Sequence, residues 1–244
     1  MEWSDDALVI GSRRHGETGL LLELLTREHG RHLGFVPGGR SRRIAPMLQP
    51  GNAVRATWRA RLDEHLGTFA VEATELRAAR YIANPRSLYG LAAMTALLRL
   101  LPERDPHPHI FDTAQDLADH LDEPEVAGAL FVGFELTLLS VLGFGLDLSE
   151  CAATGARSDL AFVSPRTGRA VSRAAGEPWR DKLLSLPAFL VHDGGLNRVP
   201  GDQLAEAFAL TGYFLDRWIF EPQGLKPPQE RTRFVASVTR DERP

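Results

Sequence analysis

The sequence has little cysteine and no long apolar run, and each shortage excludes a class of protein. One cysteine, Cys151, excludes a disulfide framework and is typical of a reducing compartment. No uninterrupted apolar run approaches the ~18 residues of a membrane span. The opening stretch MEWSDDALVI carries acids where a secretory signal carries positive charge. We therefore expect a cytoplasmic protein without membrane contact.

Size and overall charge set further limits. The 244 residues are 43% hydrophobic and 25% charged, which is an ordinary globular composition. The formal net charge of −4 argues against nucleic-acid binding over the whole surface. It does not exclude a local basic patch, because counterion release depends on the local field.

The charges are unevenly distributed along the chain. Residues 9–62 hold ten arginines and three acids, and residues 37–62 hold six arginines and no acid. Residues 102–125 hold eight acids and a single arginine. We predict two domains, a basic one over residues 1–80 and a more acidic one over residues 81–244.

The first domain has the pattern of short strands. Five segments separated by Gly, Asn and Asp turn signals cover residues 7–16, 18–30, 31–39, 53–62 and 67–76. Val54 and Trp58 alternate with Arg55 and Arg59, so these arginines, with Arg61, should project from one face of a strand. Five strands without intervening helices predict an OB-fold barrel, and an SH3-like barrel fits nearly as well. Together with the helices predicted for the second domain, this barrel gives the fold class α+β.

The second domain has helical periodicity. Residues 87–101, 109–125 and 200–220 read as amphipathic helices, whereas residues 124–145 are apolar nearly all round and should be buried. Residues 224–234 read as a tail held by prolines. Residues 146–184 are rich in turns and form an insertion in the helical body.

The insertion has part of a zinc-ribbon pattern. Cysteines at 151, 154, 172 and 175 would give the signature C-x2-C-x17-C-x2-C. The sequence has Cys151, Thr154, Ser172 and Ala175 at these positions, and this set cannot hold tetrahedral zinc. We expect no metal and no other cofactor, and read His107 and His109 as the lead-in to a helix.

The arginines are the best candidates for a functional site. Their distribution predicts binding of phosphates, with the loop glycines bringing backbone N–H groups close and Phe35 stacking on bases. The alternatives are a charged face that serves solubility and an arginine excess that comes from codon usage. The predicted DNA-binding residues are Arg13, Arg14, His15, Phe35, Arg40, Arg42, Arg43, Arg55, Arg59 and Arg61.

Catalysis has little support. The chain has no phosphate-binding glycine loop followed by lysine and no G-x-S-x-G motif. His192 and Asp193 could form an acid–base pair in a hydrolase, but HDGG reads better as a turn. We expect no enzyme, and an OB-type RNA-binding factor also remains open.

Three stretches resemble the RecO family of recombination mediator proteins. They are GETGLLLELLTREHGRHLGFVPGGRS, GFGLDLSECAATG and VSPRTGRAVS, and the order of barrel, helical body and late insertion is similar too. The chain departs where many members keep four cysteines. The resemblance implies a DNA repair protein that binds single- and double-stranded DNA and anneals complementary strands. Its implied partners are RecR, the acidic C-terminal tail of single-stranded DNA-binding protein and, indirectly, RecA.

A partner tail of this kind needs an apolar pocket with arginine at its rim. Arg99, Arg104, Arg180 and Arg217 lie near apolar helices. We prefer Arg99 and Arg104, because the neighbouring leucines at 97, 98, 100 and 101 offer more apolar area than one buried face requires.

Overall fold

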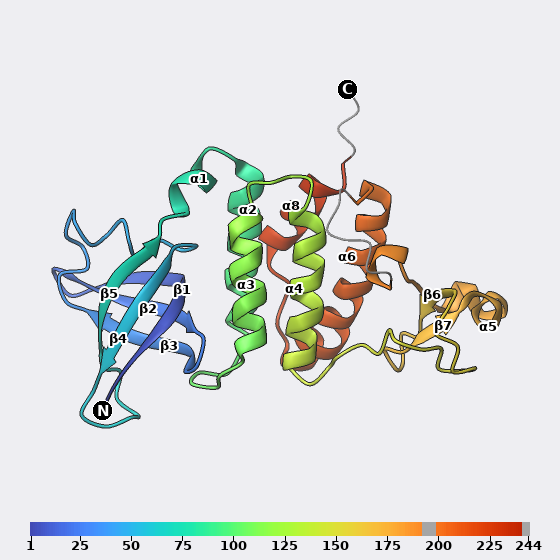
Figure 1. The fold of residues 1–244 in the computed structure, drawn as a ribbon, viewed down its shortest axis with the longest axis horizontal. Helices are drawn as coiled ribbons and strands as arrows, with labels where there is room; N and C mark the ends of the chain where they lie inside the picture. Colours follow the sequence, from blue (N-terminus) through green and yellow to red (C-terminus); the bar gives the residue numbers. More distant parts are fainter. Residues whose placement is uncertain (192–198, 241–244) are drawn as a thin grey trace. The chain divides into compact units, whose positions relative to one another are not determined.

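The N-terminal strands close into a barrel in the computed structural model, which describes residues 1–191 and 199–240 (Figure 1). The strands are β1 (Glu2–His15), β2 (Gly19–Thr26), β3 (Gly30–Val36), β4 (Ala53–Arg59) and β5 (Thr68–Glu75). Their order around the barrel is β1-β2-β3-β5-β4, with a parallel contact only between β3 and β5. This confirms the predicted OB-type barrel.

The barrel core is formed by the inward faces of the alternating strands. Val54, Ala56 and Trp58 of β4 are at most 1% exposed, as the sequence pattern predicts. The Trp58 indole N–H donates to the Leu66 carbonyl over 3.0 Å. Gly67 has a φ of +65°, and a Cβ there would lie 2.3 Å from the Trp58 ring nitrogen, so glycine is required at this turn.

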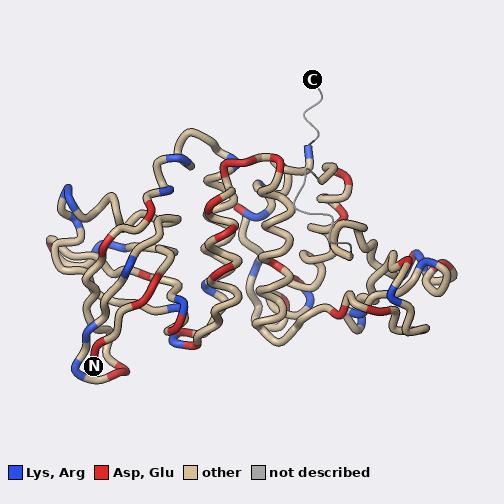
Figure 2. Tube along the Cα trace, in the orientation of Figure 1, with Lys and Arg blue, Asp and Glu red and all other residues tan. Residues whose placement is uncertain are grey.

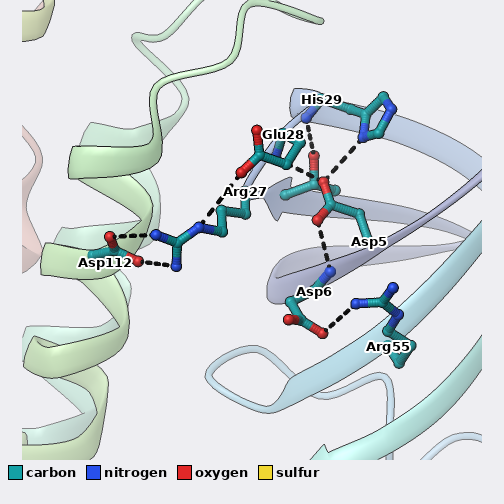
Figure 3. Close-up of polar contacts among 8 residues, drawn as sticks. Asp5, Asp6, Arg27, Glu28, His29, Arg55 and Asp112 are labelled. Carbon is teal, nitrogen blue, oxygen red and sulfur yellow. Dashed lines mark hydrogen bonds and ion pairs between the residues drawn. The ribbon is translucent and has the colours of Figure 1, made fainter.

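Three helices follow the barrel and pack with it. They are α1 (Ala78–Ile82), α2 (Pro85–Leu98) and α3 (Pro108–His120). Figure 3 shows Arg27 of the barrel bonded to Asp112 of α3 over 2.7 and 3.0 Å. Buried Arg77 likewise donates to Asp119 over 2.7 Å. The barrel and these helices form one compact unit, Met1–Asp122.

The second compact unit is Glu123–Pro244. Its main helices are α4 (Ala127–Val141), α6 (Gly201–Leu215) and α8 (Gln229–Val238), and α6 continues into a π-helical turn, Asp216–Phe220. Helix α4 is buried over most of its surface, as its apolar sequence predicts. None of the helices in the described ranges has the length and apolar character that a bilayer crossing requires. The barrel ends at Glu75, near the predicted domain boundary, whereas the first compact unit extends to Asp122.

The insertion forms a small sheet of three strands in the order β7-β6-β8. The strands are β6 (Leu160–Val163), β7 (Ala170–Ser172) and β8 (Leu184–Ser185). Helix α5 (Arg173–Gly176) and the 3₁₀ turn η1 (Glu177–Lys182) connect β7 to β8. The short elements η2 (Ala188–Leu190) and α7 (Glu221–Gln223) complete the unit.

One prediction about this unit is wrong. Residues 224–234 are not a tail, because helix α8 begins at Gln229 and its Phe234 is 0% exposed. The prolines precede the first helical turn, where a missing N–H costs little. They therefore start the helix instead of ending the ordered chain.

Candidate nucleic-acid interface

The predicted binding residues at the end of β1 and those in the loop after β3 meet at one end of the barrel. Arg40 lies in the loop after β3, its backbone N–H donates to the Thr18 carbonyl over 3.1 Å, and its guanidinium donates to the Glu17 carbonyl. These bonds hold the loop against the turn that follows β1. We define the basic end of the barrel as Arg14 and His15 of β1 with Arg40, Arg42 and Arg43 of this loop.

The basic end carries cations that are free to bind anions. Arg14, Arg42 and Arg43 are exposed, and none of them forms an ion pair with any residue that the structure describes. The loop also contains Gly38, whose φ of +62° lies in the left-handed region that favours glycine. Unpaired guanidinium groups on a glycine-rich loop are suited to phosphate oxygens.

Phe35 lies beside the basic end and is half-buried. Its ring covers Gly19, where a Cβ would lie only 2.2 Å from the ring. His15 meets the same ring edge-on, with the ring centroids 5.7 Å apart. The predicted stacking residue is therefore held in place next to the unpaired arginines, while Trp58 is in the core.

The strand arginines are different, because they are already paired. Glu2 lies opposite Arg59 and Asp6 opposite Arg55 in the register of β1 and β4. Both ion pairs measure 2.9 Å. The hydrogen bond from Arg59 lowers the pKa of Glu2, and the bonds to Asp6 and Glu2 raise the pKa of Arg55 and of Arg59, respectively. These two arginines therefore offer less free charge than the sequence suggested.

Arg61 and Arg13 also lie apart from the arginines beside them in the sequence. Strand β4 ends at Arg59, so Arg61 does not share its face but lies exposed in the next loop. Arg13 borders a hollow of ≈ 350 Å³ together with Glu23, Arg31 and Arg99. A further hollow of ≈ 360 Å³ has Arg59 at its edge and extends from the loop after β3 to β5.

Arg99 and Arg104 connect the segment after α2 to the barrel. Arg99 donates to the Glu23 carboxylate over 2.8 Å and to the Ile10 carbonyl over 2.9 Å. Arg104 has a φ of +63° and donates to the His65 carbonyl over 2.9 Å and to the Asp63 carbonyl. The leucines at 97, 98 and 101 are at most 2% exposed, so they belong to the core.

Sequence reasoning missed an apolar hollow that does adjoin Arg99. It has a volume of ≈ 630 Å³ and is lined by Ile10, Pro50, Ile82, Leu88 and Leu91 among others. Ile82 and Leu88 are 73% and 41% exposed. Helical periodicity alone could have indicated it, since these two apolar positions do not face the core.

Cys151 is a buried, hydrogen-bonded residue of the insertion. The Cys151 Sγ accepts a hydrogen bond of 3.2 Å from the Ser172 N–H and is 1% exposed. Within residues 1–191 and 199–240, no group of three potential metal ligands lies together. His107 is the N-cap residue of α3 and contacts Asp105 over 3.1 Å. His192 and Asp193 lie outside the described residues.

Together, the strand order and the basic end define an OB-type barrel fused to a helical body. The family model for the N-terminal part of recombination protein O matches residues 1–77, and the model for its C-terminal part matches residues 83–226. The chain belongs to the recombination protein O (RecO) family.

Curated relatives agree over the whole chain. The protein is 60% identical over 244 residues to a DNA repair protein RecO from Methylobacterium nodulans, which covers 99% of each chain. It is 61% identical to a protein of that name from Methylorubrum extorquens, over 98% of this chain and 99% of the relative. For a relative of the same name from Rhizobium etli the identity is 58%, over 98% of this chain and 93% of the relative.

Proposed function

We propose that the protein is a DNA repair and homologous recombination mediator that binds single- and double-stranded DNA through the basic end of its barrel. The observation that carries this proposal is the set of unpaired, exposed arginines on an OB-type barrel of a RecO-family chain. Their guanidinium groups neutralise phosphates, and Phe35 provides a ring for a base. Such contacts are insensitive to base sequence, which suits a mediator of repair at any site.

The acidic helix α3 gives the DNA a direction of approach. Figure 2 shows acidic positions gathered along this helix, and Asp112 and Asp119 are bonded to Arg27 and Arg77. The remaining acid of the helix, Asp116, is exposed and repels phosphates, so DNA avoids this side of the first unit. The surface that carries α3 is then available to bind partner proteins.

The proposed reaction involves no covalent chemistry. Binding two complementary strands on one surface lowers their mutual repulsion and raises their local concentration, so the strands anneal. With RecR, the protein then helps to load RecA onto strands coated by single-stranded DNA-binding protein. In this proposal the chain is not an enzyme, because it supplies charge and position only.

The acidic tail of single-stranded DNA-binding protein is the proposed occupant of the hollow beside Arg99. The apolar lining takes the terminal apolar side chains of the tail, and the part of the Arg99 guanidinium that is bonded to neither Glu23 nor Ile10 faces the carboxylates of the tail. Arg104 is also predicted for this site from the sequence, but it does not line the hollow. Arg99 is therefore the main cation of the proposed site.

The proposal is tested by strand annealing. Complementary single strands coated with single-stranded DNA-binding protein are mixed with the wild-type protein or with the variant Arg42→Ala/Arg43→Ala, and duplex formation is followed by fluorescence. We expect the variant to anneal much more slowly, while the control Arg55→Ala/Arg59→Ala keeps most of its rate because those arginines are paired. Equal rates for all three proteins would contradict the proposal. Tighter binding to RNA in a competition assay would favour the RNA-binding alternative instead.

A further inference from the structure

The 3₁₀ turn η1 exposes a tryptophan far from the barrel in sequence. Trp179 is 59% exposed, and it is the most exposed aromatic side chain among the described residues. Large aromatic rings dominate binding energetics because they bury much apolar area at a low entropic cost. The exposed indole therefore offers an apolar face to a ligand.

The surroundings of Trp179 are charged. The Lys182 ammonium lies over the ring, 5.4 Å from its centroid. Arg180 is exposed as well, and neither cation forms an ion pair with the described part of the chain. Figure 2 shows basic positions in the segment that carries α5 and η1. An aromatic face flanked by free cations is the combination that binds single-stranded nucleic acid.

A hollow of ≈ 580 Å³ adjoins the turn. Arg173 and Arg180 line it, with Phe162 and Leu186 among its apolar residues. Arg173 is bonded to Asp159 over 3.2 Å. Arg180 has no ion pair among the described residues, so its guanidinium is available to a ligand. Arg173 and Arg180, on either side of Trp179 in the sequence, thus line one recess together with the acids Glu177 and Glu206.

The turn is held firmly against the small sheet. Gly176 packs so close to Phe162 that a Cβ would lie 2.4 Å from the ring, and Pro178 restricts the next backbone angle. The Leu183 N–H donates to the Arg180 carbonyl over 3.2 Å and closes the turn. Because the backbone of the turn is already fixed, stacking of a ligand on the ring orders little further chain.

We propose that Trp179, Arg180 and Lys182 form a second contact for single-stranded nucleic acid, in which a base stacks on the indole and the cations meet the flanking phosphates. This inference rests on the proposed DNA-binding function and adds a site outside the barrel. A protein partner fits the observations less well, because the residues of η1 other than Pro178 and Trp179 are all charged.

The charge balance of this site distinguishes it from the basic end. Residues 173–182 hold three cations, but Glu177 and Asp181 lie among them and leave a local charge of only +1. Stacking should therefore contribute more than phosphate neutralisation. Loss of the ring should weaken binding about tenfold, as expected for one stacked base, and should hardly change the dependence of affinity on salt.

The test uses tryptophan fluorescence and affinity together in the full-length protein. A short oligothymidylate is titrated into the wild type, Trp179→Phe and Trp218→Phe, and affinity is measured separately with a labelled strand. We expect the strand to quench the wild type and Trp218→Phe, while Trp179→Phe loses most of the quenching. Trp218 is the matched control because its ring packs on Phe214, 4.3 Å between centroids. Trp179→Ala should bind about tenfold more weakly, and Trp179→Phe should bind nearly as well as the wild type.

This test distinguishes failure of the second site from failure of the proposed DNA-binding function. Unchanged affinity of Trp179→Ala, with quenching retained in Trp179→Phe, would overturn the second site while leaving the basic end intact. If the wild type bound no DNA at all, both proposals would fail. Quenching retained in Arg40→Ala/Arg42→Ala/Arg43→Ala at saturating strand would support a contact that is independent of the basic end.

Discussion

The guanidinium of Arg231 on α8 donates to both carboxylate oxygens of Glu135 on α4, over 2.5 and 2.9 Å. Glu135 is 0% exposed, and the Thr211 hydroxyl of α6 donates to the same carboxylate over 2.5 Å. Three helices of the second unit thus meet at one buried, fully bonded charge, and the pair raises the pKa of Arg231 despite its burial.

Removing one partner should be costly. Arg231→Ala leaves the Glu135 carboxylate buried without its cation, and this should lower the free energy of unfolding by about 3–5 kcal/mol. Arg217→Ala breaks an exposed pair with Glu221 and should change it by less than about 0.5 kcal/mol. Urea denaturation followed by tryptophan fluorescence measures both variants. Similar small losses in the two would show that the buried pair is not important for stability.

The barrel should be sensitive to acid because of His32. This side chain is 2% exposed among Trp3, Trp58 and Phe69, and neither ring nitrogen has a partner in the described structure. Burial lowers the pKa of His32 to about 4, from an ordinary value near 6.5. The folded state therefore holds the neutral form, and stability falls as pH drops from 6.5 toward 4. The loss from this group should be about 3 kcal/mol.

The substitution His32→Leu removes this titration while keeping the site apolar. Its free energy of unfolding should depend less on pH between 6.5 and 4 than that of the wild type. His109→Ala, on the exposed face of α3, is the control and should keep the wild-type dependence. Parallel pH profiles for the wild type and His32→Leu would exclude the buried histidine as the cause.

The insertion should be stable without zinc. Cys151 is the one thiol available, and its sulfur is bonded to the Ser172 N–H inside the small sheet. We expect no stoichiometric metal in elemental analysis and no change of Tm with a chelator. Cys151→Ala should cost about 1 kcal/mol because its hydrogen bond is removed, and it should leave DNA affinity unchanged. One zinc per chain, released with loss of folding, would contradict this prediction.

The partner-tail site should depend on the apolar hollow as much as on charge. Ile82→Ser changes a side chain that is 73% exposed, so folding should be preserved while an acidic peptide ending in an aromatic residue binds at least several-fold more weakly. Arg99→Glu should weaken it further. Calorimetry with the peptide measures both effects. Full affinity in the two folded variants would remove this hollow from consideration, and Arg104→Glu then tests the other predicted arginine.

Much of the barrel could be predicted because turn residues and alternation are local signals. The five strands and the inward face of Trp58 follow from such signals. The pairing of Arg55 and Arg59 does not, because their acids, Asp6 and Glu2, are supplied by β1 from about 50 residues away. A stretch without acids in sequence is therefore not a stretch without acids in space.

The missed features have similar causes. The sequence does not predict helix α8, because two prolines before it suggest a pinned tail, although Pro is tolerated before the first turn of a helix. The exposure of Trp179 was not predictable, because a single aromatic residue in a turn-rich segment gives no periodic signal. The opposite error concerned Leu97 and Leu98, which looked like surplus apolar surface but are fully buried.

DNA binding by the basic end is tested most directly by the salt dependence of affinity for a single strand. Log affinity against log salt is measured for the wild type, for Arg40→Ala/Arg42→Ala/Arg43→Ala and for Arg55→Ala/Arg59→Ala. Removing one phosphate contact should flatten the slope by roughly 0.7 to 0.9, so we predict a clear flattening in the triple variant. The double variant should change little, because its arginines are paired with Asp6 and Glu2. An unchanged slope in the triple variant would show that the DNA does not bind there.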